Sequence, residues 1–155
     1  MDLLGSLVDR DREPRVGLYV DGPNVFREEF DVDLDELRSI AGEEGAVAAA
    51  RLYLDEHATP ALIQAGEARG FEVVTTSGDV DVRLSVDATA AIIDGDIDVV
   101  VIVSRDTDFK PVLELAAGEG VRTVAIAPGA HGRSDALQNT AQRALTLGED
   151  RGRKN

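Results

Sequence analysis

The chain contains no cysteine and only 2 histidines among its 155 residues. The absence of cysteine excludes disulfides and thiolate metal sites, so oxygen atoms are the main ligands left for a metal ion. No apolar run is long enough to cross a bilayer, and residues 1–14 lack the basic start and apolar stretch of a secretory signal. We therefore expect a cytoplasmic protein with no membrane partner.

Lysine is also scarce. Only Lys110 and Lys154 are lysines, all other basic residues are arginines, and the excess of acidic residues gives a net charge of −14. This composition is typical of a surface that stays hydrated in high salt, and it predicts a haloarchaeal source. In ordinary salt the same charge argues against nucleic-acid binding, because phosphates need cations. In molar salt the repulsion is screened within a few ångströms.

Short apolar runs alternate with segments of helical periodicity along the chain. Strands are expected at residues 15–20, 46–54, 71–76, 98–104 and 121–128, and helices at 33–45, 59–69, 81–94 and 106–120. The alanines of 46–54 would also suit a helix, but the position of this segment favours a strand. Residues 134–145 are expected to form a helix, or a helix followed by a short strand.

This alternation predicts a three-layer α/β fold, in which helices cover both faces of a parallel sheet. We expect the strand order 3-2-1-4-5, with or without a short extra strand at the edge. Residues 15–148 would form one domain, between a charged N-terminal tail at 1–14 and a C-terminal tail at 149–155.

Acidic and polar residues gather where the predicted strands end. Asp21 follows the first strand, Asp81 follows the third, and Asp106 and Asp108 follow the fourth. In parallel sheets the carboxyl ends of the strands meet at one edge, where ligands bind, so these carboxylates should converge. Converging carboxylates raise one another's pKa unless a cation compensates them. Oxygen ligands in this number suit Mg²⁺ or Mn²⁺.

Each of these residues also has a purely structural interpretation. An aspartate after a strand often caps the next helix, as Asp81 and Asp106 are placed to do. Asp55 and His57 are expected in a surface loop. Asp87 interrupts the otherwise uncharged segment "LSVDATAAII", where it is either partnered or exposed on the outer stripe of the helix.

The stretch "VDGPN" at residues 20–24 separates this chain from other α/β proteins with an aspartate after the first strand. A phosphatase of the haloacid-dehalogenase type needs a second aspartate two residues after its nucleophile, where this chain has Pro23. A phospho-acceptor receiver domain needs an acidic pair after the first strand, and a Toprim-like domain begins with a glutamate. The pattern therefore favours a metal-held water over a covalent aspartyl mechanism.

Three motifs in combination resemble the NYN domain family, the LabA-like branch of the PIN-like metal-dependent nucleases. They are D-G-x-N at 21–24, D-V-x-L-x-x-D at 81–87 and S-x-D-x-D-F at 104–109, and the resemblance extends from about Val16 to Leu147. It implies a PIN-like fold, an acidic pocket that binds Mg²⁺ or Mn²⁺, and hydrolysis of RNA phosphodiester bonds. The family often has a lysine where this chain has Gly78 or Asp79, and an aspartate where it has Gln142.

Carried across motif by motif, the resemblance implies these catalytic residues: Asp21, Asn24, Asp81, Asp87, Ser104, Asp106 and Asp108. The aspartates of this set would hold the metal, and the resemblance leaves open whether Asp81 or Asp87 is a direct ligand. Asn24 and Ser104 would orient water, phosphate or a carboxylate. A metal-activated water would attack phosphorus in line while the metal stabilises the leaving oxygen.

RNA is the expected partner, and its phosphates would meet polar and basic side chains near this edge. The predicted substrate contacts are Asn24, Arg83, Arg105 and Lys110, with Arg27, His131 and Arg133 as further candidates. Arg105 would equally suit an ion pair with a neighbouring acid. The alternative function is a module of the same fold that binds metal or RNA without useful cleavage. A homodimer is compatible with either function.

Overall fold

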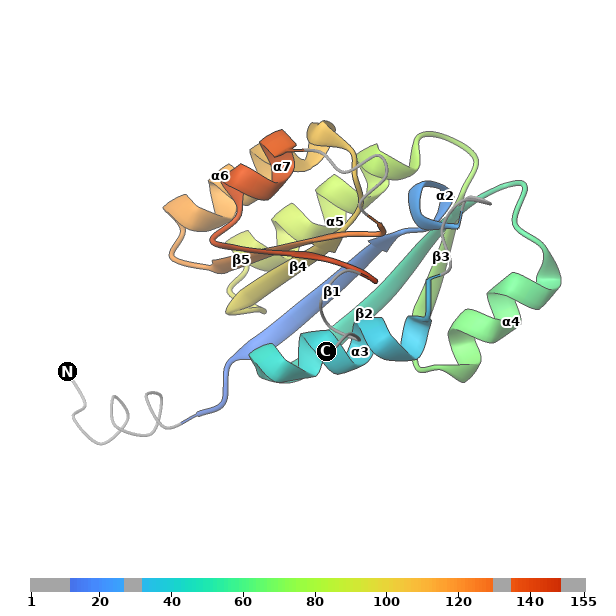
Figure 1. Ribbon diagram of the computed structural model, residues 1–155, viewed down its shortest axis with the longest axis horizontal. Helices are drawn as coiled ribbons and strands as arrows, with labels where there is room; N and C mark the ends of the chain where they lie inside the picture. Colours follow the sequence, from blue (N-terminus) through green and yellow to red (C-terminus); the bar gives the residue numbers. More distant parts are fainter. Residues whose placement is uncertain (1–11, 27–31, 130–134, 149–155) are drawn as a thin grey trace.

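Six parallel strands form one sheet in the computed structural model, which describes residues 12–26, 32–129 and 135–148 (Figure 1). The strands lie in the order β3-β2-β1-β4-β5-β6. Their bounds are β1 Arg15–Asp21, β2 Ala46–Asp55, β3 Glu72–Thr76, β4 Val99–Val103, β5 Arg122–Ala127 and β6 Arg143–Thr146. The predicted three-layer α/β fold and strand order are therefore confirmed, and β6 is the extra edge strand.

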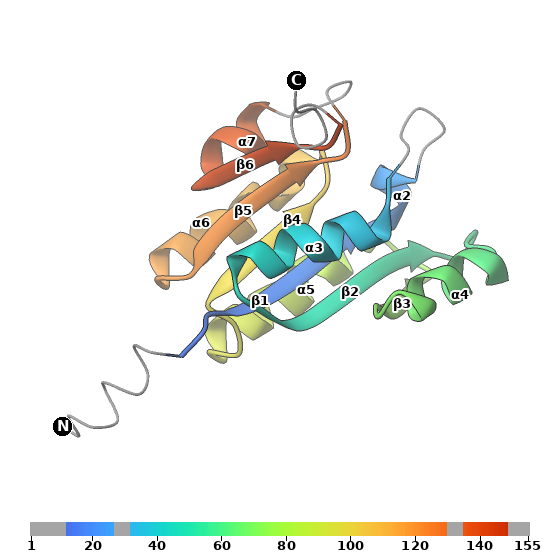
Figure 2. The ribbon, with the colours of Figure 1, turned by 60° about the horizontal axis from the view of Figure 1, so that its bottom comes forward.

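Helices connect the strands and cover both faces of the sheet, with α3 in front of it and α5 behind it in Figure 2. Their bounds are α2 Gly22–Val25, α3 Leu34–Glu44, α4 Pro60–Ala68, α5 Val80–Ile93, the 3₁₀ turn η1 Thr107–Phe109, α6 Lys110–Gly118 and α7 Asp135–Thr140. Apolar side chains of α3 and α4 pack on one face. Those of α5, α6 and α7 pack on the other.

The central strands β1 and β4 are buried on both faces, as their continuous apolar runs predict. All residues of β4 are buried, and so are residues 16–21 of β1. These two strands pair in register from Val16 with Val99 to Val20 with Val103. The last residue of β1, Asp21, therefore lies next to the residue that follows β4, Ser104, at the carboxyl edge of the sheet.

The secondary structure of two segments, residues 46–55 and 22–25, is determined by their contacts with neighbouring strands. Residues 46–55 form a strand in spite of their alanines, because they pair with β1 on one side and β3 on the other. Residues 22–25 form one turn of helix directly after β1, and proline is tolerated in a first helical turn, where Pro23 lies. A Cβ at Gly22 would lie 2.4 Å from both the Tyr53 carbonyl oxygen and Leu54 Cδ2, so this close approach to β2 requires glycine.

The two predicted tails fall mainly beyond the described ranges: residues 1–11 and all of 149–155 lie outside the part of the chain that the structure describes. Within that part, no helix combines the length and the apolar character needed to span a membrane.

Candidate metal centre

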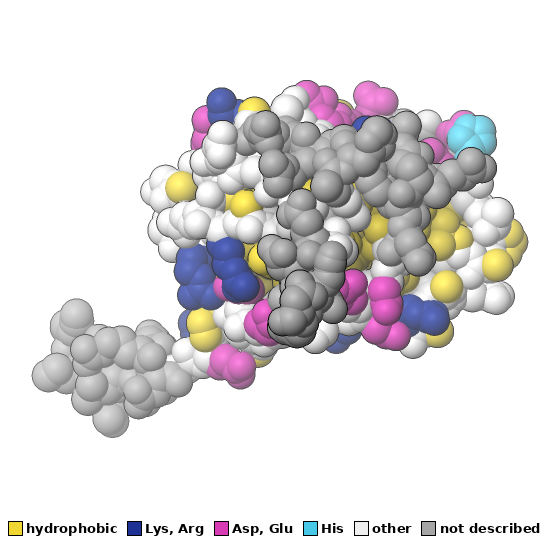
Figure 3. All heavy atoms as spheres, viewed as in Figure 1, with side chains coloured by type: hydrophobic (Ala, Val, Ile, Leu, Met, Phe, Trp, Pro, Cys, Tyr) yellow, Lys and Arg dark blue, Asp and Glu magenta, His cyan; other side chains and the backbone are white. Residues whose placement is uncertain are grey.

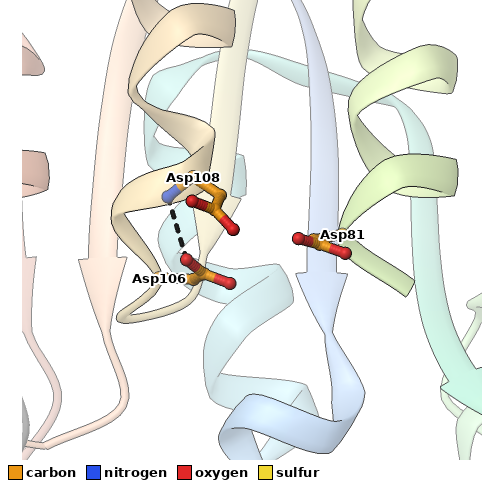
Figure 4. Close-up of side chains that lie close together, drawn as sticks. All are labelled: Asp81, Asp106 and Asp108. Carbon is orange, nitrogen blue, oxygen red and sulfur yellow. Dashed lines mark hydrogen bonds between the residues drawn. The ribbon is translucent and has the colours of Figure 1, made fainter. Parts of the chain in front are cut away.

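Three carboxylates from two elements meet at the carboxyl edge of the sheet (Figure 4). Asp81 lies in the first turn of α5. Asp106 precedes the turn η1 and Asp108 lies within it, just after β4. One oxygen of each residue lies within 4.8 Å of the corresponding oxygens of the other two. The fold brings Asp81 beside Asp106 and Asp108, which lie at least 25 residues later in the sequence.

The loop after β4 is held by its own polar groups. Asp106 caps η1, because its Oδ1 accepts a hydrogen bond of 2.9 Å from the backbone N–H of Asp108. Phe109 is fully buried beneath the loop and fixes the end of this turn in the core. The predicted cap at Asp106 is therefore present, and its second carboxylate oxygen still faces the space shared with Asp81 and Asp108 (Figure 4). We call these three residues, together with Asp21, the acidic group.

Asp21 is tied to the same loop through Ser104. Asp21 is only 5% exposed, and its Oδ2 accepts a hydrogen bond of 3.0 Å from Ser104 Oγ. The same hydroxyl oxygen accepts a bond of 3.0 Å from the backbone N–H of Asp106. Asn24 adds a second link, since its Oδ1 accepts from the backbone N–H of Arg105 at 2.8 Å. Ser104 and Asn24 thus orient Asp21 and the Asp106 loop relative to each other.

The electrostatic environment disfavours full ionisation of this group. Burial is the main cause that raises the pKa of Asp21 to about 6, with the charges of Asp106 and Asp81 adding to it and its hydrogen bonds opposing it. The neighbouring charge of Asp106 raises the pKa of Asp108, and a hydrogen bond with Asp81 adds to this effect. A bound cation would relieve both costs.

An open cavity of about 380 Å³ faces these residues. Its polar lining consists of Asp21, Asn24, Asp55, Asp79, Asp81 and Asp106. Sequence reasoning did not select Asp55, which is the last residue of β2 rather than a surface-loop residue, or Asp79, which precedes α5. The signal was available, because β2 and β3 lie beside β1 in the predicted order, so their carboxyl ends share the edge with Asp21.

Asp87 does not lie in this group. Its carboxylate accepts hydrogen bonds from Tyr53 Oη at 2.9 Å and from Arg83 Nε at 3.2 Å, and its Oδ2 lies 3.4 Å from a guanidinium nitrogen of Arg51. Asp81 and Asp87 are six residues apart on one helix, which places them about 9 Å apart along the axis and about a third of a turn around it. Asp87 therefore anchors α5 to β2.

The predicted basic contacts have different surroundings. Arg83 pairs with Asp87, one turn further along α5, and does not line the acidic cavity. Lys110 is exposed at the start of α6 and lines a groove of about 600 Å³ together with Asp81 and Asp108. Arg105 contributes its backbone N–H to Asn24. Three further candidates, Arg27, His131 and Arg133, lie outside the described residues.

The donor set fits a hard divalent cation. Every side chain of the group offers oxygen, the carboxylates converge from separate elements, and the raised pKa of Asp21 records an uncompensated cost. Mg²⁺ and Mn²⁺ prefer such ligands, whereas softer metals prefer nitrogen or sulfur. Asp21, Asp81, Asp106 and Asp108 are the residues that would hold the ion.

Comparison with known proteins identifies the family. Residues 15–148 match the NYN domain. An uncharacterized protein of Methanocaldococcus jannaschii is 41% identical over 142 residues, which cover 91% of this chain, and the chain spans 58% of that relative's length. The crystal structure of a protein of unknown function from Vibrio parahaemolyticus shares the fold, with a TM-score of 0.78 at 23% identity over 90% of this chain and 96% of that one. The resemblance of the three sequence motifs is thereby confirmed: the chain belongs to the NYN domain family, a PIN-like family of generally nuclease-like proteins.

Proposed function

We propose that this protein is a divalent-metal-dependent ribonuclease that hydrolyses RNA phosphodiester bonds. The observation that carries the proposal is the convergence of Asp81, Asp106 and Asp108, two of which line an open cavity together with the buried Asp21. Membership of a nuclease-like family supports the same function. Mg²⁺ and Mn²⁺ are the proposed cofactors.

The chain's own residues have distinct roles in this proposal. When bound, a divalent cation would polarise the phosphate, help a water molecule to lose its proton and neutralise charge on the leaving oxygen. Asp21, Asp81 and Asp106 would hold the cation, with Ser104 fixing the orientation of the Asp21 carboxylate. Asp108, whose carboxylate lies beside those of Asp81 and Asp106, would bind the same cation directly or through a water molecule.

The groove beside the acidic group is the proposed path for RNA. It is walled by Val82, Val86 and Pro111, and it shares Asp81 with the acidic cavity. Val82 and Val86 are more than half exposed, so sugars and bases can pack against them. Lys110 lies in the same lining and offers a cation to a phosphate oxygen.

A panel of RNAs incubated with Mn²⁺ or Mg²⁺, at low and molar salt, tests the proposal. We expect cleavage that chelation abolishes and that Asp106→Asn or Asp21→Asn lowers by at least about a hundredfold, as loss of an essential electrostatic contribution does. Asp94→Asn is the matched control, because Asp94 ends α5 far from Asp81 and removes the same charge. Equal cleavage by wild type and Asp106→Asn would show that the activity arises elsewhere or from a contaminant.

A second candidate function is a regulatory module that binds metal or RNA without useful turnover. One observation favours it: among the described residues that line the acidic cavity there is neither lysine nor arginine, so phosphate has little to attract it. Metal binding by calorimetry, with RNA retention and no cleavage by any of the panel, would select this alternative over the enzyme.

A further inference from the structure

A second cavity of about 430 Å³ lies between the C-terminal half of α5 and the amino-terminal halves of β1 and β2. It shares no lining residue with the acidic cavity, because it lies farther from the carboxyl edge of the sheet. Its size is within the range of small-molecule sites in proteins. The nuclease proposal makes no use of it.

Small side chains create this space. The helix contributes Ala90 and Ala91, and β2 contributes Ala48 and Ala49 at an irregularity where its register with β1 shifts. Such irregularities often lie beside functional sites. Opposite them, a Cβ at Gly17 would lie 2.8 Å from Tyr19 Cε2 and 2.9 Å from its hydroxyl, so glycine is needed for this tyrosine to lie along the strand.

Tyr19 is the most deeply buried polar residue in the lining of this cavity. Tyr19 is 1% exposed, it lines the cavity, and its hydroxyl has no hydrogen-bond partner among the residues described. The tyrosine on the neighbouring strand differs, since Tyr53 donates to Asp87. Burial raises the pKa of Tyr19 to about 12, so its hydroxyl keeps its proton and can both donate and accept. Buried polar groups are nearly always partnered, so this one indicates a missing ligand.

The charges around the cavity do not balance. Arg15 is engaged by Asp98 at 3.4 Å, and Arg51 is engaged by Glu72 at 3.1 Å and by Asp87. The other two carboxylates of the lining belong to Asp94 and Asp96, on either side of Gly95. In the described part of the chain neither has an ion-pair partner. The lining therefore retains a negative surplus at its exposed rim.

We propose that this cavity binds a small aliphatic amine that carries a second hydrogen-bonding group. The ammonium group would meet Asp94 and Asp96 at the rim, the hydrocarbon chain would pack on the alanine walls, and the far polar group would bond the Tyr19 hydroxyl. Each part of the ligand thus has a complementary surface in the cavity. The proposal is independent of the nuclease function, because no residue is shared between the two cavities.

Calorimetric titration of the full chain at physiological ionic strength tests the proposal, with 1,6-diaminohexane as the probe. Hexane-1,6-diol and adipate are probes of matched length that lack the ammonium group. We expect saturable binding of the diamine alone. Tyr19→Phe should weaken it about three- to tenfold, the loss of one hydrogen bond, without unfolding the protein, since the deleted hydroxyl has no partner in the described part of the chain.

The rim is tested by charge-matched variants. Asp94→Asn with Asp96→Asn should weaken diamine binding by about tenfold or more. Glu67→Gln with Glu119→Gln removes the same charge from exposed positions outside the cavity and should leave binding unchanged. Equal losses in the two double variants would mean only general attraction to an acidic protein. Binding unaffected by Tyr19→Phe, or no binding of the diamine, would each overturn the proposal.

Discussion

A single hydroxyl, that of Ser104, connects the two halves of the acidic group. It donates to Asp21 at the end of β1 and accepts from the backbone of Asp106 after β4. Ser104 is 1% exposed, so water cannot readily replace it if it is removed. A buried carboxylate with few donors is costly, and this cost is what makes Asp21 responsive to pH and to cations.

Asp21→Asn should make the metal-free protein more stable at neutral pH. The pKa of Asp21 rises on folding from 3.8 to about 6, so its contribution to stability is fully present below pH 3.8 and is lost as pH rises through 6. At about 1.4 kcal/mol per pKa unit, the wild type should lose up to about 3 kcal/mol across this window. Urea unfolding with chelator should therefore show the variant ahead at pH 7 and level with the wild type near pH 4.

Added Mn²⁺ supplies the control for this measurement. It should stabilise the wild type at pH 7, because a ligand that binds only the folded state shifts unfolding by mass action. The Asp21→Asn protein should respond weakly. A variant that is less stable than the wild type at pH 7 without metal would contradict the assigned cost of the buried carboxylate.

Sequence reasoning placed Asp21, Asp106 and Asp108 at one edge because that placement depends only on strand order. The position of Asp87 depends instead on helix rotation and on partners from β2, Tyr53 and Arg51. A motif states the spacing of two aspartates but not which face of the helix each occupies. The six-residue spacing was itself the available signal that both cannot face one ion.

At the scale of elements, α5 has one function at its start and another in its middle. Asp81 in its first turn faces the acidic group, while Asp87 binds Tyr53 and Arg51 of β2. The second contact fixes the rotation of the helix, and with it the direction of Asp81. Anchoring and metal binding are therefore separable by mutation.

Asp81→Asn and Asp87→Asn should differ in their effects. Asp81→Asn should lower Mn²⁺ affinity at least about tenfold, as loss of a ligand or its close support does, with little change in stability. Asp87→Asn should lower the free energy of unfolding by about 1–3 kcal/mol, because it leaves charged partners of a half-buried network without their carboxylate. Calorimetry and urea unfolding measure the two quantities. A larger loss of Mn²⁺ affinity in Asp87→Asn would restore Asp87 as a metal ligand.

Glu44 connects α3 to the far edge of the sheet. It is the last residue of the helix, it is 8% exposed, and its carboxylate binds Arg122 at 3.0 Å and also Arg143. These arginines begin β5 and β6, so one side chain holds the start of both strands. The edge strand β6 depends on this contact more than the central strands do, because it has a neighbour on one side only.

Glu44→Ala should therefore destabilise the protein by about 1–3 kcal/mol, through the loss of two charge-assisted contacts and of their partner. Relative to the wild type, the substitution should speed up hydrogen exchange more in β6 than in β4. Glu119→Gln, at an exposed position after α6, is the control for charge alone. If the Glu44 variant unfolds at the same urea concentration as the wild type, the contacts of Glu44 with Arg122 and Arg143 contribute nothing to stability.

Elements that are buried throughout could be predicted from their own residues. Elements that form because they pair with another part of the chain were predicted less well. The five-residue strand β4 could be read from its unbroken apolar run. The segment 134–145 offered two forms, and the strand β6 is chosen by pairing with β5. The single turn of α2 depends on the gap between Gly22 and β2, which no local pattern contains.

At the scale of the whole molecule, charge is distributed as isolated pairs within an acidic excess. On the face drawn in Figure 3, the basic side chains lie next to acidic ones. The chain has 30 acidic against 16 basic residues, so many carboxylates have no cation to pair with. Their mutual repulsion opposes the compact state, and salt relieves it.

Thermal stability should therefore rise with salt. Screening shortens the range of repulsion from about 10 Å at 0.1 M to about 3 Å at 1 M, while contacts inside the core are little affected. For a domain of this size each kcal/mol is worth about 2–4 °C, and we expect Tm to rise by at least about 4 °C in molar KCl by circular dichroism. Glu67→Gln with Glu119→Gln should raise Tm at low salt and reduce the response to KCl, since both residues are exposed and add to the repulsion. Tetramethylammonium chloride at the same ionic strength separates screening from potassium binding, because screening alone predicts an equal rise in Tm.

A Tm that is constant or falls with KCl would mean that the acidic surface is not an adaptation to salt. The predicted haloarchaeal source would then lose its physical basis.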